Sequence, residues 1–468
     1  MTSKTIEDAL QKLNEFIVNL EGKGDLSKRK LEPFEIGLLF GHNDEGVLVL
    51  NREETNEYWE CLDELYYSRL HYSRLHYSRL HYSRETHKHH SKRAVELLMQ
   101  KAILRALDTN HLRSDRSFND RLRESINELR DKLMASLMDW VVHMRIEGLA
   151  PEGLPYKFGK VNFWVADENN LDELKKPYNA IIDGRTDPPE TKLSLKTEFE
   201  NSIKEHFLGF PIASVKISAC DGEAACSAAR RELRLTMDVI NFYSDILMCT
   251  PGLGSQLRFV GELQPTSELL LAFGINPSFF YLSHKFVGPL TPVSFKKVKL
   301  VEEAESVGFY RINEILAKDN RNSLEEKILA SIQWAGRATV ERQQRPEDAF
   351  LHYAIALETI ILGRQENVEL SYRLSMRTAL LAGDTPENRE KIKKEVRDLY
   401  NIRSKIVHSG HYEVTDIDVE KIRVLTYTCI MRILTEEPFI SMIEEQEIGD
   451  WFDKAMLSGC LLEDDTQS

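Results

Sequence analysis

The chain has 468 residues and a formal net charge of −14, with 42% hydrophobic and 29% charged residues. Single hydrophobic cores stop growing at about 250–300 residues, so two or three domains are expected. The composition is that of an ordinary globular protein and excludes wholesale disorder, and the negative charge argues against broad coating of nucleic acid, DNA included. No apolar run approaches the roughly 18–20 residues of a membrane span, and the N-terminus lacks a signal-peptide block. A cytoplasmic protein without membrane contact is therefore expected.

The cysteines favour neither disulfides nor zinc. They form no CxxC pair, and no histidine follows any of them at zinc-finger spacing. We therefore expect reduced thiols and no metal or other cofactor. Their positions are Cys61, Cys220, Cys226, Cys249, Cys429 and Cys460.

The N-terminal part, residues 1–150, is expected to be mainly helical. Residues 5–20 repeat apolar side chains at helical spacing, 34–50 indicate two short strands around a turn, and 91–147 indicate two long helices. The Pro- and Gly-rich stretch 148–160 then predicts a domain boundary.

A short repeat interrupts this part. YSRLH occurs three times in succession, at 67–71, 72–76 and 77–81. Five residues turn a helix by about 500°, so equivalent side chains cannot line one face. The repeat is interpreted as a basic surface insertion, with contact to RNA as a lesser alternative. A cluster follows without a helpful Cys, so a metal site is conceivable but not expected; it comprises His87, His89 and His90.

Residues 151–322 predict an α+β region. Short strand patterns (VNFWVAD, ASVKISA, LRFVGEL, ELLLAFG) alternate with Pro-containing turns, and a helix is expected near 223–248. The region has no phosphate loop, no GxGxxG and no nucleophile elbow, so its sequence indicates no activity.

Residues 323–435 predict an antiparallel helical bundle, because short loops join amphipathic helices. Residues 436–468 carry ten acids and one lysine, and are expected to form a solvated, partly disordered acidic tail. The signals that open the expected bundle helices are Ser323, Pro346, Leu370, Pro386 and Asp416 or Asp418, and those that end them include Gly363, Gly383 and Gly410.

The fourth of these helices places a charge on its apolar side. Arg403 lies on the apolar stripe, where an unpaired charge would cost several kcal/mol, so it needs an acidic partner, an anionic ligand or an interface. The apolar stripe comprises Ile392, Val396, Leu399, Tyr400 and Val407. The neighbouring stripe is polar and comprises Arg397, Asn401, Ser404 and His408.

Three segments carry a family resemblance: AIALETIILG (354–363), LSYRLSMRTALLAG (370–383) and LYNIRSKIVHSG (399–410). In order, spacing and local residues they resemble the ApeA-like branch of the HEPN superfamily, over about a quarter of the chain. The resemblance implies a mainly α fold with a HEPN bundle that forms a homodimer. It also implies a metal-independent endoribonuclease, of the kind found in phage-defence and toxin systems, with RNA as substrate.

The resemblance also implies roles for the fourth helix. Arg403 and His408 are the expected catalytic pair: His408 transfers a proton, and Arg403 holds the scissile phosphate. Ser404, Tyr400 and Glu358 are expected auxiliary residues. Arg403 and His408 lie about 140° apart around an ideal helix, so a symmetric dimer would help to bring them together.

Other interpretations remain open. In one of them, Arg403 is a buried ion-pair partner of Glu358 and His408 is a cap at the C-terminal end of the helix. A second is a non-catalytic HEPN module that binds RNA, nucleotide or a partner protein. A third, a toxin silenced by nucleotidylation of a tyrosine, requires Arg-x4-His-x-Tyr, but Gly410 occupies that position and the nearest tyrosine is Tyr412. The spacing Arg-x4-His also occurs at 84–89, within the repeat tail and without this context.

Overall fold

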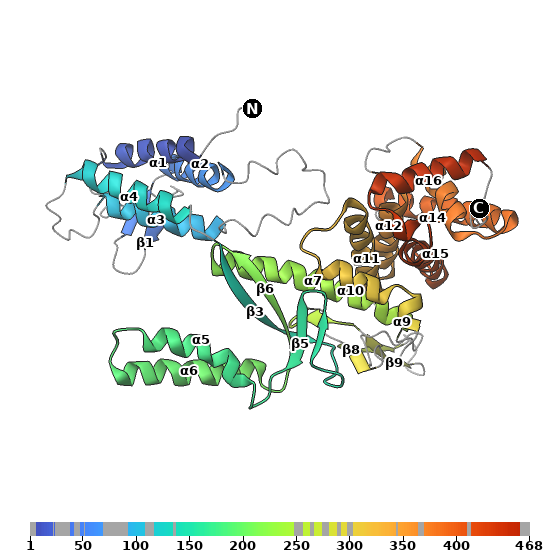
Figure 1. The fold of residues 1–468 in the computed structure, drawn as a ribbon, viewed down its shortest axis with the longest axis horizontal. Coiled ribbons are helices and arrows are strands. Elements are labelled where there is room, and N and C mark those ends of the chain that lie inside the picture. The colour runs from blue at the N-terminus through green and yellow to red at the C-terminus, as the bar shows by residue number, and fades with distance from the viewer. Residues whose placement is uncertain are drawn as a thin grey trace. The chain divides into compact units, whose positions relative to one another are not determined.

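The computed structural model is mainly α, with a small antiparallel sheet (Figure 1). The chain divides into two compact units, Met1–Val142 with Lys216–Arg231, and His143–Val215 with Glu232–Ser468. The structure describes residues 6–21, 23, 38–41, 47–50, 52–68, 92–107, 117–133, 137–247, 256–262, 266–273, 280–287, 292–296, 303–342, 345–363, 369–409 and 413–458.

The first unit contains a four-helix core. Helices α1 and α2 pack together, as do α3 and α4, and their apolar sides form one buried cluster. The two short strands expected in 34–50 are confirmed as an antiparallel hairpin. The bounds are α1 Ile6–Glu21, β1 Leu38–Gly41, β2 Val47–Leu50, α2 Arg52–Ser68, α3 Lys92–Leu107 and α4 Phe118–Leu133. The YSRLH repeat beyond Ser68 and the histidines at 87–90 lie outside the described residues.

The second of the two long helices expected within 91–147 is shorter than predicted. The helix α4 ends at Leu133, and Met138–Glu147 (MDWVVHMRIE) forms strand β3. This segment is rich in β-branched and aromatic residues, which favour a strand; the apolar positions upstream had suggested that the helix continued.

The sheet has the strand order β4-β5-β6-β3-β7, and its described pairings are antiparallel. The four strands expected from the sequence are confirmed as β5, β6, β7 and β8. The bounds are β4 Tyr156–Phe158, β5 Val161–Val165, β6 Pro211–Ala219 and β7 Arg258–Phe259, and a separate hairpin contains β8 Thr266–Phe273 and β9 Phe280–Val287.

The first unit's N-terminal part ends at Val142, a few residues before the Pro- and Gly-rich stretch 148–160, and that stretch itself packs in the second unit. Phe158 is fully buried, and Leu149 is 5% exposed. The glycines serve tight packing instead of a linker: Gly148 has a φ of +85°, and a Cβ at this position would lie 1.8 Å from the carbonyl oxygen of Gln256.

Three helices accompany the sheet. The antiparallel pair α5 (Leu171–Asp183) and α6 (Pro189–Phe207), which the sequence did not predict, shares an apolar cluster with β5 and β6. Helix α7 (Gly222–Leu247) confirms the helix expected near 223–248. The short helices α9 (Glu303–Ser306) and α10 (Phe309–Ala317) precede the C-terminal bundle.

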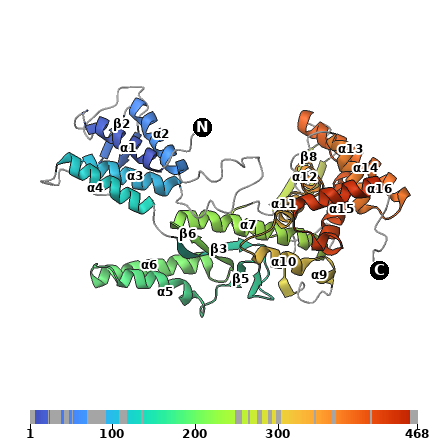
Figure 2. The ribbon, with the colours of Figure 1, turned by 45° about the horizontal axis from the view of Figure 1, so that its top comes forward.

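The five bundle helices expected within 323–435 are confirmed. Among them α11 packs on α12, α13 on α14, and α12 on α15 (Figures 1 and 2). One cap differs: Asn322, not Ser323, caps α11, because its side chain and that of Glu325 form a reciprocal capping box. The bounds are α11 Ser323–Glu341, α12 Pro346–Ile361, α13 Leu370–Ala382, α14 Pro386–Ser409 and α15 Asp416–Thr435.

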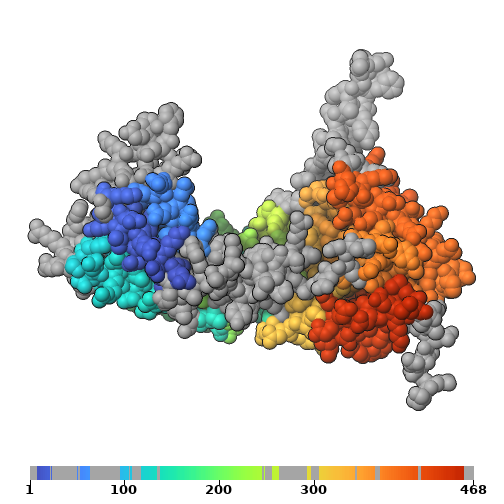
Figure 3. Space-filling view, turned by 90° about the horizontal axis from the view of Figure 1, so that it is seen from above, coloured from blue at the N-terminus to red at the C-terminus, as the bar shows by residue number. Residues whose placement is uncertain are grey.

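The solvated tail expected from residue 436 is wrong for residues 436–458. A short 3₁₀ turn, η5 (Phe439–Ser441), and the helix α16 (Glu445–Ser458) extend the bundle, and Phe439 and Phe452 are fully buried. Helix α16, in red, lies beside the orange part of the bundle (Figure 3), where it packs against α11 and α13. Most acidic side chains of α16 are exposed and dominate its composition. A count of charged residues therefore does not reveal the apolar stripe on the buried face of this helix. Residues 459–468 lie outside the described residues.

A buried arginine ties α16 to the bundle. Arg377 on α13 is only 2% exposed. Its Nη2 lies 3.2 Å from Oδ1 of Asp453 on α16, and its guanidinium carbon lies 5.3 Å from the ring centre of Phe452. The bundle therefore includes α16 as a structural member.

Most of the α+β region, residues 151–215 and 232–322, belongs to the same unit as the bundle, although the sequence separated them at 322/323. Helices α7 and α11 approach closely at Gly336, where a Cβ would lie 1.9 Å from the carbonyl oxygen of Asp238. The Asp238 carboxylate accepts a hydrogen bond of 3.2 Å from Nε of Arg337. Close backbone packing and an ion pair between Arg337 and the buried Asp238 thus join the two regions.

Candidate functional site

Helix α14 carries the two expected catalytic residues. Its first turn begins at Pro386, which suits a helix start, and its bundle-facing side buries Ile392, Val396 and Leu399. The apolar stripe expected further along does not stay buried: Val407 is 52% exposed. The last turns of α14 therefore present side chains to solvent on more than one face.

Arg403 pairs with Glu358 of α12. Its Nε lies 3.3 Å from Oε1 of Glu358, which is the expected partner, but the pair is not fully buried as expected. The side chains keep 28% and 24% of their surface exposed, and the two facing atoms form no hydrogen bond of acceptable geometry. The guanidinium carbon also lies 6.0 Å from the ring centre of Tyr400. Arg403 is therefore held at the surface of the bundle by an ion pair that leaves part of its side chain open.

The electrostatics of this pair are uneven. Burial raises the pKa of the Glu358 carboxyl above its ordinary value, and the neighbouring Arg403 only partly offsets the shift. Desolvation disfavours the carboxylate more than the arginine favours it. The pair is thus weaker than its distance alone suggests.

His408 lies in the last turn of α14 and is exposed. Ser404, one turn earlier, is half-buried. In the described part of the chain, no hydrogen bond or ion pair joins Arg403 to His408. Five residues along a helix separate them by about 7.5 Å of rise and about 140° of rotation, so α14 alone does not bring the two side chains together. Gly410 and Tyr412 lie outside the described residues.

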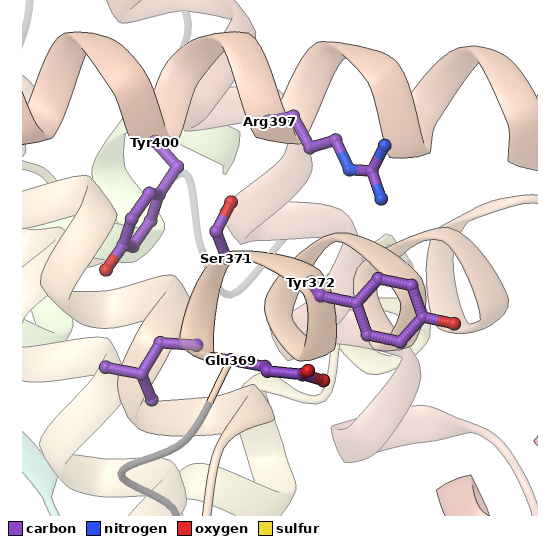
Figure 4. A pocket seen from close by; sticks show the side chains of 6 residues that line it. Glu369, Ser371, Tyr372, Arg397 and Tyr400 are labelled. Carbon is purple, nitrogen blue, oxygen red and sulfur yellow. The ribbon is translucent and has the colours of Figure 1, made fainter.

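A pocket of about 860 Å³ opens between the first turn of α13 and the middle of α14. Three lining side chains, Glu369, Tyr372 and Arg397, extend to the same side of it, on the right of Figure 4. The other lining residues are Leu370, Ser371 and Tyr400. Tyr400 belongs both to this pocket and to the surroundings of Arg403, so pocket and ion pair are neighbours.

The sequence placed Arg397 on the polar stripe of α14 but did not single out the α13 residues of this pocket. Tyr372 is 45% exposed on a helix whose other large side chains are mostly covered. An exposed aromatic residue beside a buried stripe was the available signal, and only the packing of α13 on α14 gives it meaning.

A second polar cluster lies on the sheet. His143 Nδ1 and Ser214 Oγ are 2.7 Å apart, and Trp164 Nε1 donates to the same Oγ at 2.6 Å. Burial lowers the pKa of His143, against a smaller opposing effect of Glu173. Ser214 is only 5% exposed, and these bonds link β3, β6 and β5, so the cluster has the character of a structural network.

Three further observations concern metal binding, membrane spans and similarity to known proteins. Among the described residues, no group of three or more His, Cys, Asp or Glu side chains is arranged to hold a metal ion. None of the described helices is both long and apolar enough to cross a bilayer. Comparison of the chain with protein-family models, with curated proteins and with solved structures gave no match.

Proposed function

We propose that the chain is a metal-independent endoribonuclease of HEPN type, with Arg403 and His408 as its catalytic residues. The observation that carries the proposal is the state of Arg403: the guanidinium is fixed beside Glu358 and Tyr400, yet 28% of the side chain is exposed. An exposed histidine follows one and a half turns later on the same helix. The resemblance of 354–410 to ApeA-like HEPN domains supports the same assignment.

The proposed reaction takes its nucleophile from RNA. His408 removes the proton of a 2′-OH, and the 2′ oxygen attacks the adjacent phosphorus. The bond from phosphorus to the 5′ oxygen breaks, and a second His408, of the partner protomer, protonates that oxygen. Arg403 stabilises the negative charge that develops on the phosphate oxygens, and Glu358 positions its guanidinium.

This scheme needs a homodimer through the bundle. A single helix places Arg403 and His408 on different sides, whereas a twofold axis beside the end of α14 brings two copies of each together. The exposed Val407, between the two residues, gives such an interface an apolar contact. Adding an excess of the inactive His408→Ala protein to wild type tests it: heterodimers hold only one His408, so the rate should fall below that expected from the amount of wild-type protein alone. A rate that stays proportional to the amount of wild-type protein, although the two proteins exchange subunits, would contradict a shared site.

A non-catalytic HEPN module that binds RNA, nucleotide or a partner protein is the second candidate. The ion pair itself favours it, because Arg403 paired to Glu358 already has a structural role. Under either candidate we place the protein in the cytoplasm, and under the first as a defence or toxin effector.

The two candidates differ in turnover. The full chain is incubated with single-stranded RNA of mixed sequence in EDTA. We expect cleavage by the wild type and a loss of about 10²–10⁴-fold for His408→Ala. Lys405→Ala removes an exposed charge from the same helix and should keep the rate. Binding without cleavage by folded wild-type protein would leave the binding module as the function.

A further inference from the structure

The pocket between α13 and α14 has the chemistry of a nucleotide site. Tyr372 offers an exposed ring, and two cations stand close to it: Nζ of Lys393 lies 5.7 Å and the guanidinium carbon of Arg397 lies 5.9 Å from the ring centre. Single-stranded RNA is bound in proteins by aromatic rings that stack on bases and by cations that follow the phosphates. The ring of Tyr372 and the guanidinium of Arg397 both line the pocket of about 860 Å³, and Lys393 lies near the same ring.

The pocket also holds a base-reading group. Glu369 lines the pocket together with Tyr372 and Arg397, and its side chain extends in the same direction as theirs (Figure 4). A carboxylate only accepts hydrogen bonds, and its two oxygens match two parallel N–H donors. Guanine is the one RNA base with two adjacent N–H groups, N1–H and N2–H, on its Watson–Crick edge. The Ser371 hydroxyl points toward α14 between Arg397 and Tyr400, where it is available to the neighbouring ribose or phosphate.

The backbone at Glu369 is unusual. Glu369 has a φ of +54°, and it is the only non-glycine residue with a positive φ among those that the structure describes. A glutamate in this conformation is uncommon and costs conformational energy. The conformation sets the direction in which the carboxylate leaves the first turn of α13, so it is consistent with a positioned side chain.

We propose that this pocket is a guanine-binding subsite for single-stranded RNA. Tyr372 stacks on the base, Glu369 accepts from its N1–H and N2–H, and Arg397 with Lys393 binds the adjoining phosphate. The assignment of RNA as the ligand rests on the proposed function. Arg397 and His408 belong to one stripe of α14 and lie about 16 Å apart along the helix, so the subsite reads a base at a distance from the cleaved bond.

Binding is measured separately from cleavage with 2′-O-methylated oligonucleotides, which lack the 2′-OH nucleophile. Fluorescein-labelled hexamers of uridine with one central guanosine or one central adenosine are titrated with the full chain, and anisotropy gives each Kd. Wild type should bind the guanosine hexamer at least about fivefold more tightly, as expected for one bidentate contact to a base. Glu369→Gln should abolish this preference, because an amide offers one acceptor oxygen. Tyr372→Ala should weaken both hexamers by about fivefold or more through lost stacking.

The controls are Lys391→Ala, which removes an exposed charge from another face of α14, and Tyr310→Ala, which removes a ring that is 48% exposed on α10. Both should bind as wild type. Equal binding of the two hexamers by wild type, or a preference that survives Glu369→Gln, would overturn the subsite. A guanosine preference without cleavage of unmodified RNA would overturn only the ribonuclease, and cleavage without a preference would overturn only the subsite.

Discussion

Nε of Arg403 lies 3.3 Å from Oε1 of Glu358, and burial nevertheless holds the pKa of that carboxyl above its ordinary value. The charged form of Glu358 is therefore less favourable in the folded protein than in the unfolded chain. Its ion pair positions Arg403 without stabilising the fold.

This relationship predicts how replacing Glu358 changes the stability of the protein. Glu358→Gln should keep or raise the thermal midpoint at pH 7, because it removes a carboxylate whose burial costs more than Arg403 returns. Arg403→Ala should lower the midpoint. Its free energy of unfolding should fall by less than the about 3–5 kcal/mol that breaking a fully buried ion pair costs, because both side chains are partly exposed. Differential scanning calorimetry of both variants checks this, and a large loss for Glu358→Gln would make the pair a stabilising element.

The contact between α7 and α11 predicts a clash at one glycine. Gly336→Ala should destabilise the protein, since its Cβ would lie 1.9 Å from the carbonyl oxygen of Asp238. In an open helix the same change stabilises by up to about 1 kcal/mol. Gly449→Ala on α16 is the matched control, because the nearest atom to its Cβ would lie 3.8 Å away. Thermal midpoints that rise equally in both variants would refute the close packing.

Helix α16 should contribute to stability. Phe452→Ala should cost about 3–5 kcal/mol, as for other fully buried aromatic side chains. Leu457→Ala in the same helix should change stability by no more than about 0.5 kcal/mol, because Leu457 is 90% exposed. Urea unfolding followed by circular dichroism measures both. Equal and small losses of stability in the two variants would indicate that this segment forms the unpacked acidic tail expected from composition.

Asp238 predicts a pH dependence. Burial raises the pKa of Asp238 from 3.8 to about 6, against the attraction of Arg337. Between these two values the folded protein binds the proton that the unfolded chain has lost, so stability falls as pH rises. Asp238→Asn should therefore gain stability relative to wild type from about pH 4 to 6, and the gain should level off above that range. A difference between the two proteins that does not vary with pH would contradict the raised pKa.

Local signals in the sequence predicted the bundle well. Pro346, Pro386 and Gly383 mark the ends of helices as expected, and the Arg403–Glu358 pair was one of the two roles foreseen for Arg403. The helix ends follow from residue spacing within single helices, which can be read directly from the sequence. The ion pair follows from the need of Arg403 for an acidic partner on an apolar stripe.

The missed elements lack such signals. Ile203 is the one buried residue of helix α6, so the sequence of this helix shows almost no apolar stripe. Helix α16 combines an acidic surface with a buried face, and its acids dominated the prediction. The α13–α14 pocket depends on which turns of two helices meet, and Glu369 gains its role only from that tertiary contact.

The most direct test of the ribonuclease is the chemistry of the product ends. RNA is incubated with wild type, His408→Ala and Arg403→Ala in EDTA, and the fragment ends are mapped while melting curves verify the fold. Attack by the 2′-OH must leave a 2′,3′-cyclic phosphate and a 5′-hydroxyl, and each variant should lose about 10²–10⁴-fold in rate. Fragments bearing 5′-phosphates, or cleavage that persists in folded His408→Ala protein, would contradict the proposed mechanism.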